Sequence, residues 1–214
     1  MNNTQTQYTD TDIYKLNAID AVLGTKDRYT QGHTRRVAVY AMRLAYRMGL
    51  NPEETGNIGI GGMLHDIGKI GLSERILNNK TGHLYGKMLE EVHRHPTIGV
   101  SLLKGIDFPT SVLDYIYYHH ERMDGSGYPC GLKADDIPLG AKIIAVADCF
   151  DAITTDRPYQ KRKDCDQAFT ILRRMSGTSL CHELVEMFVE EIEENGMIGD
   201  GSEKENCSGK TGLI

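Results

Sequence analysis

The sequence predicts an all-α fold, and two observations carry that prediction. Apolar residues recur at spacings of three and four along several segments, which is the period of a helix with one buried face. No segment shows the strict apolar and polar alternation of a half-buried strand. With 214 residues, 40% apolar and 25% charged, the chain is of ordinary composition for one domain with its own core.

The first two predicted helices are the best defined. Segment 33–50, HTRRVAVYAMRLAYRMGL, carries one apolar stripe made of Val37, Tyr40, Ala41, Leu44, Ala45 and Met48. We expect this helix to end at Gly49, a typical C-cap residue. A second helix should start at Asn51, where a capping side chain precedes Pro52 at the first helical position and an acid two residues later.

Later segments continue the helical pattern. Stripes in 112–117 and 184–192 each predict one helix. The apolar run 143–147 is compatible with a buried strand, but its continuation to Ile153 is too long for one and favours a helix. Segments 78–86 and 122–138 are rich in Gly, Asn, Asp or Pro and should be irregular.

Domain boundaries and location follow from composition. We expect a helical N-terminal extension over 1–28, one domain over 29–198 and a disordered polar tail over 199–214. No apolar run approaches a membrane span, and the N-terminus resembles no signal peptide, so we expect a cytoplasmic protein with no membrane partner. The net charge of -6 argues against binding long nucleic acid, although a local metal or cationic site can still bind a small anion.

Two carboxylates sit in apolar surroundings that make them costly unless they are paired. His65 and Asp66 lie in GGMLHDIGKIG, and Asp148 lies in AKIIAVADCFDAI. A buried carboxylate needs a partner or a metal. For the His65–Asp66 pair, a simple buried hydrogen bond is the competing interpretation.

A divalent metal would satisfy several of these groups together, because imidazole nitrogen and carboxylate oxygen are common ligands of zinc, iron and manganese. Further nitrogens could come from His33, His95, His119 and His120. Each of these histidines, taken singly, is more often a surface or hydrogen-bonded residue. The metal hypothesis therefore depends on their joint arrangement.

That arrangement resembles the HD-GYP family of metal-dependent phosphodiesterases in the HD superfamily. The resemblance runs from about Tyr29 to about Phe188. It is carried by the following residues and motifs in order: His33, HD at 65–66 with Lys69 one turn later, His95 before Pro96, HH at 119–120, DGSGYP at 124–129, and Asp148 within VADCFDAITTDRPY. The HD dipeptide is weak alone, whereas HDIGK together with HHERMDGSGYP is specific.

The resemblance implies a helical bundle with an irregular GYP loop and a binuclear metal centre. One metal would be bound by His33, His65, Asp66 and Asp148, and the other by Asp66, His95, His119 and His120. Asp66 would bridge the two. Iron or manganese is the expected pair, because a histidine and carboxylate set without cysteine does not single out zinc.

Other roles carried over from the family concern substrate. Asp66 and Lys69 would be the catalytic residues, with Lys69 contacting phosphate; its alternative role is a partner of the preceding helix dipole. Arg157 and Lys161 are further candidates for binding substrate. Three residues, Glu121, Arg122 and Asp124, are expected to orient the paired histidines and brace the loop by ion pairs, while the loop backbone is shaped by Gly127, Tyr128 and Pro129.

The chain departs from the family pattern at several positions. Tyr29 stands where some members have a glutamate associated with a third metal, so we expect two metals. Gln160 replaces the usual basic residue after RPY, and Lys161 follows it. A common Gly-x-x-Phe-Asp-Pro pattern is replaced by 177–182, GTSLCH. The remaining histidines, His83, His93 and His182, are expected at the surface.

The expected activity is a bacterial signalling phosphodiesterase. It would hydrolyse cyclic-di-GMP to linear 5'-pGpG through a hydroxide activated by two metals, with GMP as a further product left open. A phosphodiesterase for cyclic GMP-AMP is an alternative within the same class. From another class, the chain could be a weak sensor or an interaction module that contacts a diguanylate cyclase (GGDEF-type) domain through the GYP loop. A nucleotide phosphohydrolase of the broader HD superfamily is a third hypothesis, which the GYP loop disfavours.

Overall fold

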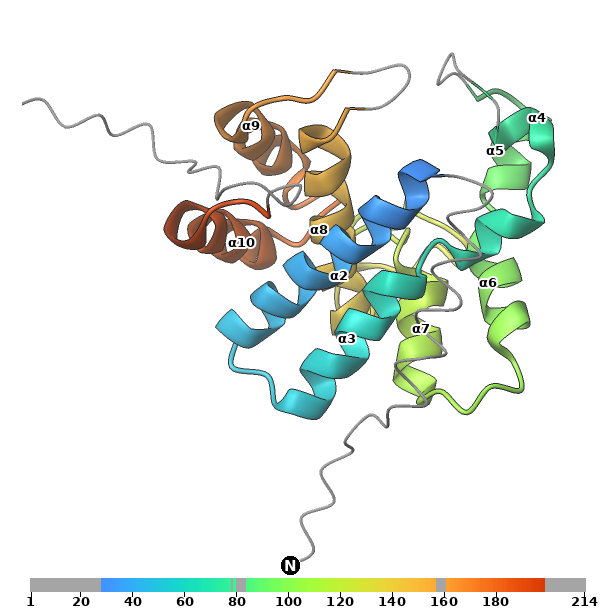
Figure 1. Ribbon diagram of the computed structural model, residues 1–214, viewed down its shortest axis with the longest axis horizontal. Coiled ribbons are helices and arrows are strands. Elements are labelled where there is room, and N and C mark those ends of the chain that lie inside the picture. The colour runs from blue at the N-terminus through green and yellow to red at the C-terminus, as the bar shows by residue number, and fades with distance from the viewer. Residues whose placement is uncertain (1–27, 78, 80–83, 157–160, 199–214) are drawn as a thin grey trace, which may run out of the picture.

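The computed structural model describes residues 28–77, 79, 84–156 and 161–198, and this part of the chain is helical (Figure 1). The described residues contain no strand, only two isolated bridges, Lys104 with Ile106 and Ser176 with Leu180. The all-α prediction is confirmed. The elements are α2 Arg28–Arg47, α3 Pro52–Leu64, the 3-10 helix η1 Ile67–Gly71, α4 Glu74–Leu77, α5 Lys87–Val92, α6 His95–Leu103, α7 Thr110–Tyr118, the 3-10 helix η2 Ala134–Asp136, α8 Leu139–Thr154, α9 Cys165–Met175 and α10 His182–Asn195.

The end of α2 and the start of α3 follow signals that are visible in the sequence, while α2 begins at Arg28, before the predicted segment 33–50. Gly49 has a φ of +77°, the left-handed conformation that terminates α2. Asn51 then caps α3: its side chain accepts the Glu54 N–H, and the Glu54 side chain returns to the Asn51 backbone. Pro52 is the first helical residue, as predicted.

Glycines in α3 allow unusually close packing. A Cβ on Gly62 would lie 3.0 Å from the Cα of Ala38 in α2, and one on Gly61 would lie 3.0 Å from the Ile144 side chain in α8. After α3 ends, Gly68 in η1 lies so near the His95 carbonyl of α6 that any side chain there would overlap it. These contacts bring the end of α3 against α2, α8 and α6 at once.

Two apolar clusters build the core. The larger one joins α2, the start of α3, α8, α9 and α10, and includes Tyr40, Phe150 and Phe188. A smaller one joins the end of α3, η1, α6 and α7, and includes Leu64 and Ile116. Figure 1 shows α9 and α10 on one side of α2 and α8, with α4, α5 and α6 on the opposite side. Residues 65 and 66 follow α3, the helix that contributes to both clusters.

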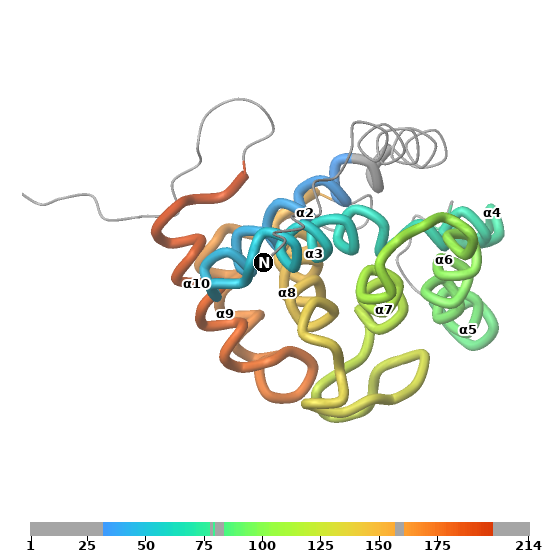
Figure 2. The backbone as a smooth tube through the Cα atoms, turned by 90° about the horizontal axis from the view of Figure 1, so that it is seen from below, coloured from blue at the N-terminus to red at the C-terminus, as the bar shows by residue number. Residues whose placement is uncertain are grey.

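The segment between α7 and α8 is a long excursion, coloured green-yellow to yellow in Figure 2. It contains turns and the short helix η2, and no element longer than η2. The prediction that segment 122–138 is irregular is confirmed. For the other irregular prediction, 78–86, residues 78 and 80–83 lie outside the described part; the described residues 79 and 84–86 are non-helical.

The predicted extension over 1–28 and tail over 199–214 fall outside the described residues, apart from Arg28 at the start of α2. They stay predictions. Among the described helices, none combines the length and the apolar character that a membrane crossing requires.

Candidate metal centre

The end of α3 brings six of the seven predicted ligands into two groups that share one carboxylate, and Asp148 belongs to neither group. Asp66 forms a group with His95, His119 and His120, and another with His33 and His65. Within each group, one candidate ligand atom per residue lies within 4.8 Å of the others. Residues that are up to 87 positions apart in the sequence are thus gathered around a buried Asp66, which is 2% exposed.

Three of the histidines are held by backbone carbonyls one turn earlier. The Nδ1–H of His65 donates to the Gly62 oxygen at 2.7 Å, and His95 and His119 make the same bond to Val92 and Ile116, each at 2.7 Å. Because a carbonyl only accepts, Nδ1 carries the proton and Nε2 keeps its lone pair. All three Nε2 atoms are therefore available as ligand atoms, and their rings are fixed by hydrogen bonds away from the centre.

His33 is held differently, by a carboxylate. Its Nδ1 lies 2.7 Å from Oδ2 of Asp151 in α8. Arg36, one turn along α2, donates to the same carboxylate from Nε at 2.5 Å and from a terminal nitrogen at 3.1 Å. The other His33 nitrogen, Nε2, lies 3.3 Å from Asp148 and 3.7 Å from Asp66.

The imidazoles of the centre differ in proton affinity because their burial and their neighbouring charges differ. Burial lowers the pKa of His33, but hydrogen bonds to Asp148 and Asp151 outweigh burial and raise its pKa to about 9. Burial lowers the pKa of His95 to about 4 and that of His120 to about 3, and it holds the pKa of His119 well below its usual value. These three imidazoles are neutral at pH 7, as metal ligands must be.

Both carboxylates of the centre are ionised. Burial raises the pKa of Asp66, but Lys69 and His65 overcome that effect and hold it well below its ordinary value. The Asp148 pKa is likewise lowered, because a hydrogen bond and the charge of His33 exceed the effect of burial. Asp148 lies on α8, one turn before Asp151, and its side chain is partly exposed. It contacts the centre at His33 Nε2.

The donor set fits a divalent cation. Among the described residues, two buried polar atoms have no hydrogen-bond partner, His65 Nε2 and Asp66 Oδ1. The Nε2 atoms of His95 and His119 lie 3.3 Å apart, and both present lone pairs because their Nδ1 atoms carry the protons. Facing lone pairs and unpaired buried oxygens are costly unless a cation lies between them.

Lys69 points at the shared carboxylate. Its Nζ donates to Asp66 Oδ2 at 2.6 Å from within η1. The side chain remains 37% exposed, so it faces both the centre and solvent. Because the ammonium pairs with the Asp66 side chain, both the phosphate contact and the role of a dipole partner for α3 stay predictions.

The bracing of the GYP loop differs from the prediction. Glu121 is buried, and its carboxylate accepts three backbone N–H groups, from Cys130, Gly131 and Leu132, at 2.6 to 3.1 Å. Asp124 accepts the Ser126 N–H at 2.8 Å. Glu121 and Asp124 therefore brace the loop through backbone N–H groups, and the expectation of bracing by ion pairs was wrong for both; Arg122 is exposed.

Gly127 and Tyr128 lie against the end of α7. A Cβ on Gly127 would overlap the backbone of residues 120–122, so only glycine fits. The Tyr128 N–H donates to the His120 carbonyl at 3.2 Å, and the peptide bond to Pro129 is cis. The Tyr128 ring packs on His120, with centroids 4.7 Å apart.

The structure corrects one predicted surface histidine. His93 is half-buried and stacks on Tyr128, with ring centroids 3.9 Å apart. His182 is exposed, as expected, and shares a hydrogen bond with Ser176 at 2.7 Å. His83, Arg157 and Gln160 lie outside the described residues, and Lys161 is exposed.

Asp151 and Arg36 were not singled out from the sequence. A signal was available: each lies three residues after a predicted ligand, Asp148 and His33, so each shares a helix face with that ligand. Which helix faces meet is a tertiary fact, and the sequence pattern does not contain it.

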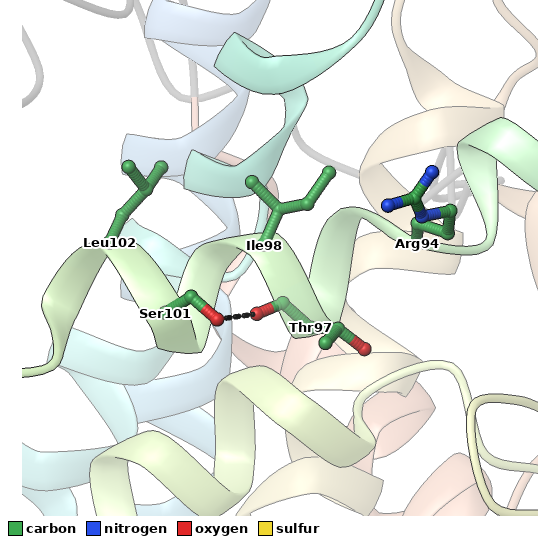
Figure 3. Close-up of a pocket in the computed structure, with 5 residues that line it drawn as sticks. All are labelled: Arg94, Thr97, Ile98, Ser101 and Leu102. Carbon is green, nitrogen blue, oxygen red and sulfur yellow. Dashed lines mark hydrogen bonds between the residues drawn. The ribbon is translucent and has the colours of Figure 1, made fainter.

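A hollow on the outer face of α6 does not belong to the centre (Figure 3). It is lined by Arg94, Thr97, Ile98, Ser101 and Leu102. Those positions follow a helical period on one side of α6, whereas His95, Gly99 and Leu103 are buried on the other. The Ser101 hydroxyl donates to the Thr97 carbonyl at 2.9 Å within this face.

The chain is similar to known proteins of one family. The family model described as HD domain matches residues 18–182. Cyclic di-GMP phosphodiesterase of Thermotoga maritima is 39% identical over 86% of this chain and 50% of its own length. For 3'3'-cGAMP-specific phosphodiesterase 3 of Vibrio cholerae, the identity is 33% over 77% of this chain and 36% of that protein. The chain therefore spans half or less of these relatives.

One solved structure shows the same fold. Bd1817, an HDG"Y"P protein from Bdellovibrio bacteriovorus, matches with a TM-score of 0.61 at 21% identity, over 74% of this chain and 50% of that one. With the matched family model, the buried His65–Asp66 pair and the GYP loop against the end of α7, the chain belongs to the HD domain family and, within it, to the HD-GYP group.

Proposed function

We propose that this chain is a metal-dependent phosphodiesterase that hydrolyses cyclic-di-GMP to linear 5'-pGpG. One observation carries the proposal: two groups of imidazole and carboxylate ligands share Asp66, and His65 Nε2 and Asp66 Oδ1 are buried without a hydrogen-bond partner. The name of the Thermotoga maritima relative supports the substrate.

The ligand sets we propose are those implied by the family pattern. His33, His65, Asp66 and Asp148 would hold one cation, and Asp66 with His95, His119 and His120 the other. When bound, two such cations supply Lewis acidity that lowers the pKa of water and balances charge on the phosphate. Iron or manganese suits these nitrogen and oxygen ligands, since no cysteine is among them.

The protein's own residues prepare the centre for this chemistry. The carbonyls of Gly62, Val92 and Ile116 orient three imidazoles, so these rings need not rotate when a cation binds. Lys69 Nζ, held at Asp66 and partly exposed, would contact the phosphate and stabilise negative charge that grows during attack. Arg157 and Lys161 would grip the dinucleotide farther from the reacting phosphorus.

The test is hydrolysis by purified protein loaded with manganese or iron. We expect conversion of cyclic-di-GMP to 5'-pGpG, with GMP as a slower product if the linear dinucleotide rebinds. The Lys69→Ala variant should keep both metals and lose most turnover. Ligand binding without turnover under either metal would contradict the proposal.

Cyclic GMP-AMP is the second candidate substrate, because the Vibrio cholerae relative carries that specificity in its name. Parallel assays with both dinucleotides at equal concentration decide between them. A ratio of kcat/KM above about tenfold in either direction corresponds to about 1.4 kcal/mol of discrimination and assigns the preference.

Two further proposals concern context. A diguanylate cyclase domain could contact the GYP loop, whose residues Asp124, Ser126 and Cys130 are exposed. Titration of a purified GGDEF-type domain against the chain tests this contact, and loss of binding on Ser126→Arg would locate it. A cytoplasmic location is tested by cell fractionation.

A further inference from the structure

His120 differs from the other imidazoles of the centre in how it is held. In the part of the chain that the structure describes, His65, His95 and His119 each have a carbonyl anchor, whereas no hydrogen bond anchors the His120 ring. His120 is instead packed among rings. The centroid of His119 lies 4.0 Å away, that of Tyr128 4.7 Å and that of His95 4.9 Å.

A second ring, that of His93, also packs on Tyr128. His93 stacks on it almost in parallel, with centroids 3.9 Å apart and an interplanar angle of 16°. His93 is the C-cap residue of α5 and lies two residues before His95, so this contact joins the loop to the junction between α5 and α6. Within the loop, the Glu121 carboxylate accepts the N–H groups of residues 130–132, and the Tyr128 N–H donates to the His120 carbonyl. A second long-range contact joins the Asp124 N–H to the Thr178 carbonyl at 2.9 Å.

We propose that His93 is a positioning residue of the metal centre. By stacking on Tyr128 it presses that ring against His120, and this packing orients the His120 imidazole in place of a hydrogen bond. Stacked and tilted aromatic pairs favour defined geometries and resist ring rotation. The inference rests on the proposed function, since His120 is taken as a ligand.

The consequence is local to one half of the centre. Losing the His93 ring should release Tyr128 and His120, and therefore weaken the cation held with Asp66, His95 and His119. The half that contains His33 and Asp148 has no part in this stack and should keep its affinity. A ring at position 93, not its imidazole nitrogen, is what the stack requires.

The variants that test this are His93→Ala and His93→Phe, with His182→Ala as a matched control on an exposed histidine. The first readout is amide exchange of loop residues 123–133 in metal-free protein, measured by mass spectrometry. The second is Mn²⁺ titration by calorimetry. We expect His93→Ala to speed loop exchange and to weaken one Mn²⁺ site about three- to tenfold, while His93→Phe and His182→Ala stay near wild type.

Each outcome has a definite meaning. Unchanged exchange and unchanged Mn²⁺ affinity in His93→Ala overturn the inference and leave the proposed function standing. The same loss in His93→Phe as in His93→Ala also overturns it, because stacking is then not the cause. If His93→Ala behaves as expected while wild type hydrolyses no cyclic dinucleotide, the inference stands and the proposed function fails.

Discussion

The two halves of the candidate centre use the same ligand types but are built in different ways. The half with His33 and Asp148 sits on α2 and α8, two long helices of the larger apolar cluster. The half with His95, His119 and His120 lies at the start of α6 and the end of α7, beside the smaller cluster. Asp66 belongs to both groups and follows the helix that contributes to both clusters.

The histidines of the two halves also differ in pKa. Hydrogen bonds to Asp148 and Asp151 raise the pKa of His33 to about 9, whereas burial lowers the pKa of His95 to about 4. A cation entering the first half must displace a proton at neutral pH, and a cation entering the second half does not. The difference follows from the surroundings of each imidazole: carboxylates outweigh burial and raise the pKa of His33, whereas burial lowers the pKa of His95.

The largest expected effect comes from the shared carboxylate. Asp66→Asn should abolish both cation sites and lower cyclic-di-GMP turnover by about three orders of magnitude or more, because Asn is a poor bridging ligand. Asp148→Asn, the matched control, should impair only the half that contains His33. Metal analysis after gel filtration, alongside the hydrolysis assay, distinguishes them; retention of one full site in Asp66→Asn would break the idea of a shared ligand.

Next in size is the effect of the carboxylate behind His33. Asp151→Asn keeps the side-chain shape but removes the charge that orients His33, and should weaken Mn²⁺ at the first half about 10- to 100-fold. Glu191→Gln is the control, since Glu191 is another buried acid paired with an arginine, Arg43, at 2.9 Å. Calorimetric titration measures both. Equal weakening of the two halves by Asp151→Asn would contradict the assignment.

The pH dependence of metal binding should separate the halves. Below about pH 9 the first half must release the His33 proton, so its Mn²⁺ affinity should rise by up to about tenfold per pH unit from pH 6 to pH 8. The second half should vary little over that range, because the pKa values of His95 and His120 are about 4 and about 3. Titrations at several pH values provide the measurement, and parallel curves for the two sites would refute the difference.

The same proton affects the metal-free fold with a defined sign. The pKa of His33 is raised from 6.5 to about 9, so the protonated form stabilises the folded state below pH 6.5, and that contribution is lost as pH rises through about 9. In Asp151→Asn, the free energy of unfolding should fall less as pH rises through this range. Urea unfolding followed by circular dichroism at several pH values measures it.

The smallest expected effect lies in the larger cluster, far from the ligands. Cys181 occupies the N-cap of α10 with extended backbone but caps nothing with its side chain. Cys181→Asp should add about 0.5 to 1 kcal/mol of stability and raise Tm by about 2 °C, with both metal affinities unchanged. Cys181→Asn shows how much of the gain is lost to repulsion from nearby Glu183. A change in either metal affinity would mean that the two regions are coupled.

Five of the described helices were predictable from apolar periodicity or local signals, whereas α4, α5, α6 and α9 were not predicted. Gly49, Asn51 and Pro52 act through their own backbone preferences and neighbours within four residues, so the sequence contains the whole cause. The run 143–153 required a choice by length, and it is indeed helical within α8.

The site was predictable only in part. His33, His65 and Asp148 could be named from a family pattern. The structure groups the two histidines with Asp66 and places Asp148 3.3 Å from His33. Asp151 and Arg36 could not be ranked above other helical residues, because their role depends on α2 facing α8. Glu121 was expected to form ion pairs, but it accepts backbone N–H groups instead. The loop returns to its first residues, so its backbone N–H groups there need an acceptor.

His93 was likewise not predictable from the sequence, because it was expected at the surface and is instead packed on Tyr128. Its sequence neighbourhood, EEVHRHP, is polar and suggests a surface residue. Only the return of the GYP loop across the α5–α6 junction places Tyr128 on its ring. A contact between residues 35 positions apart in two irregular segments leaves no periodic signal.

The central claim, two cations flanking one carboxylate, is tested most directly by anomalous diffraction from crystals soaked in Mn²⁺. We expect two anomalous peaks per chain, one contacting Asp66 with His33, His65 and Asp148, and the other contacting Asp66 with His95, His119 and His120. A single peak, or two peaks that do not share Asp66, would contradict it.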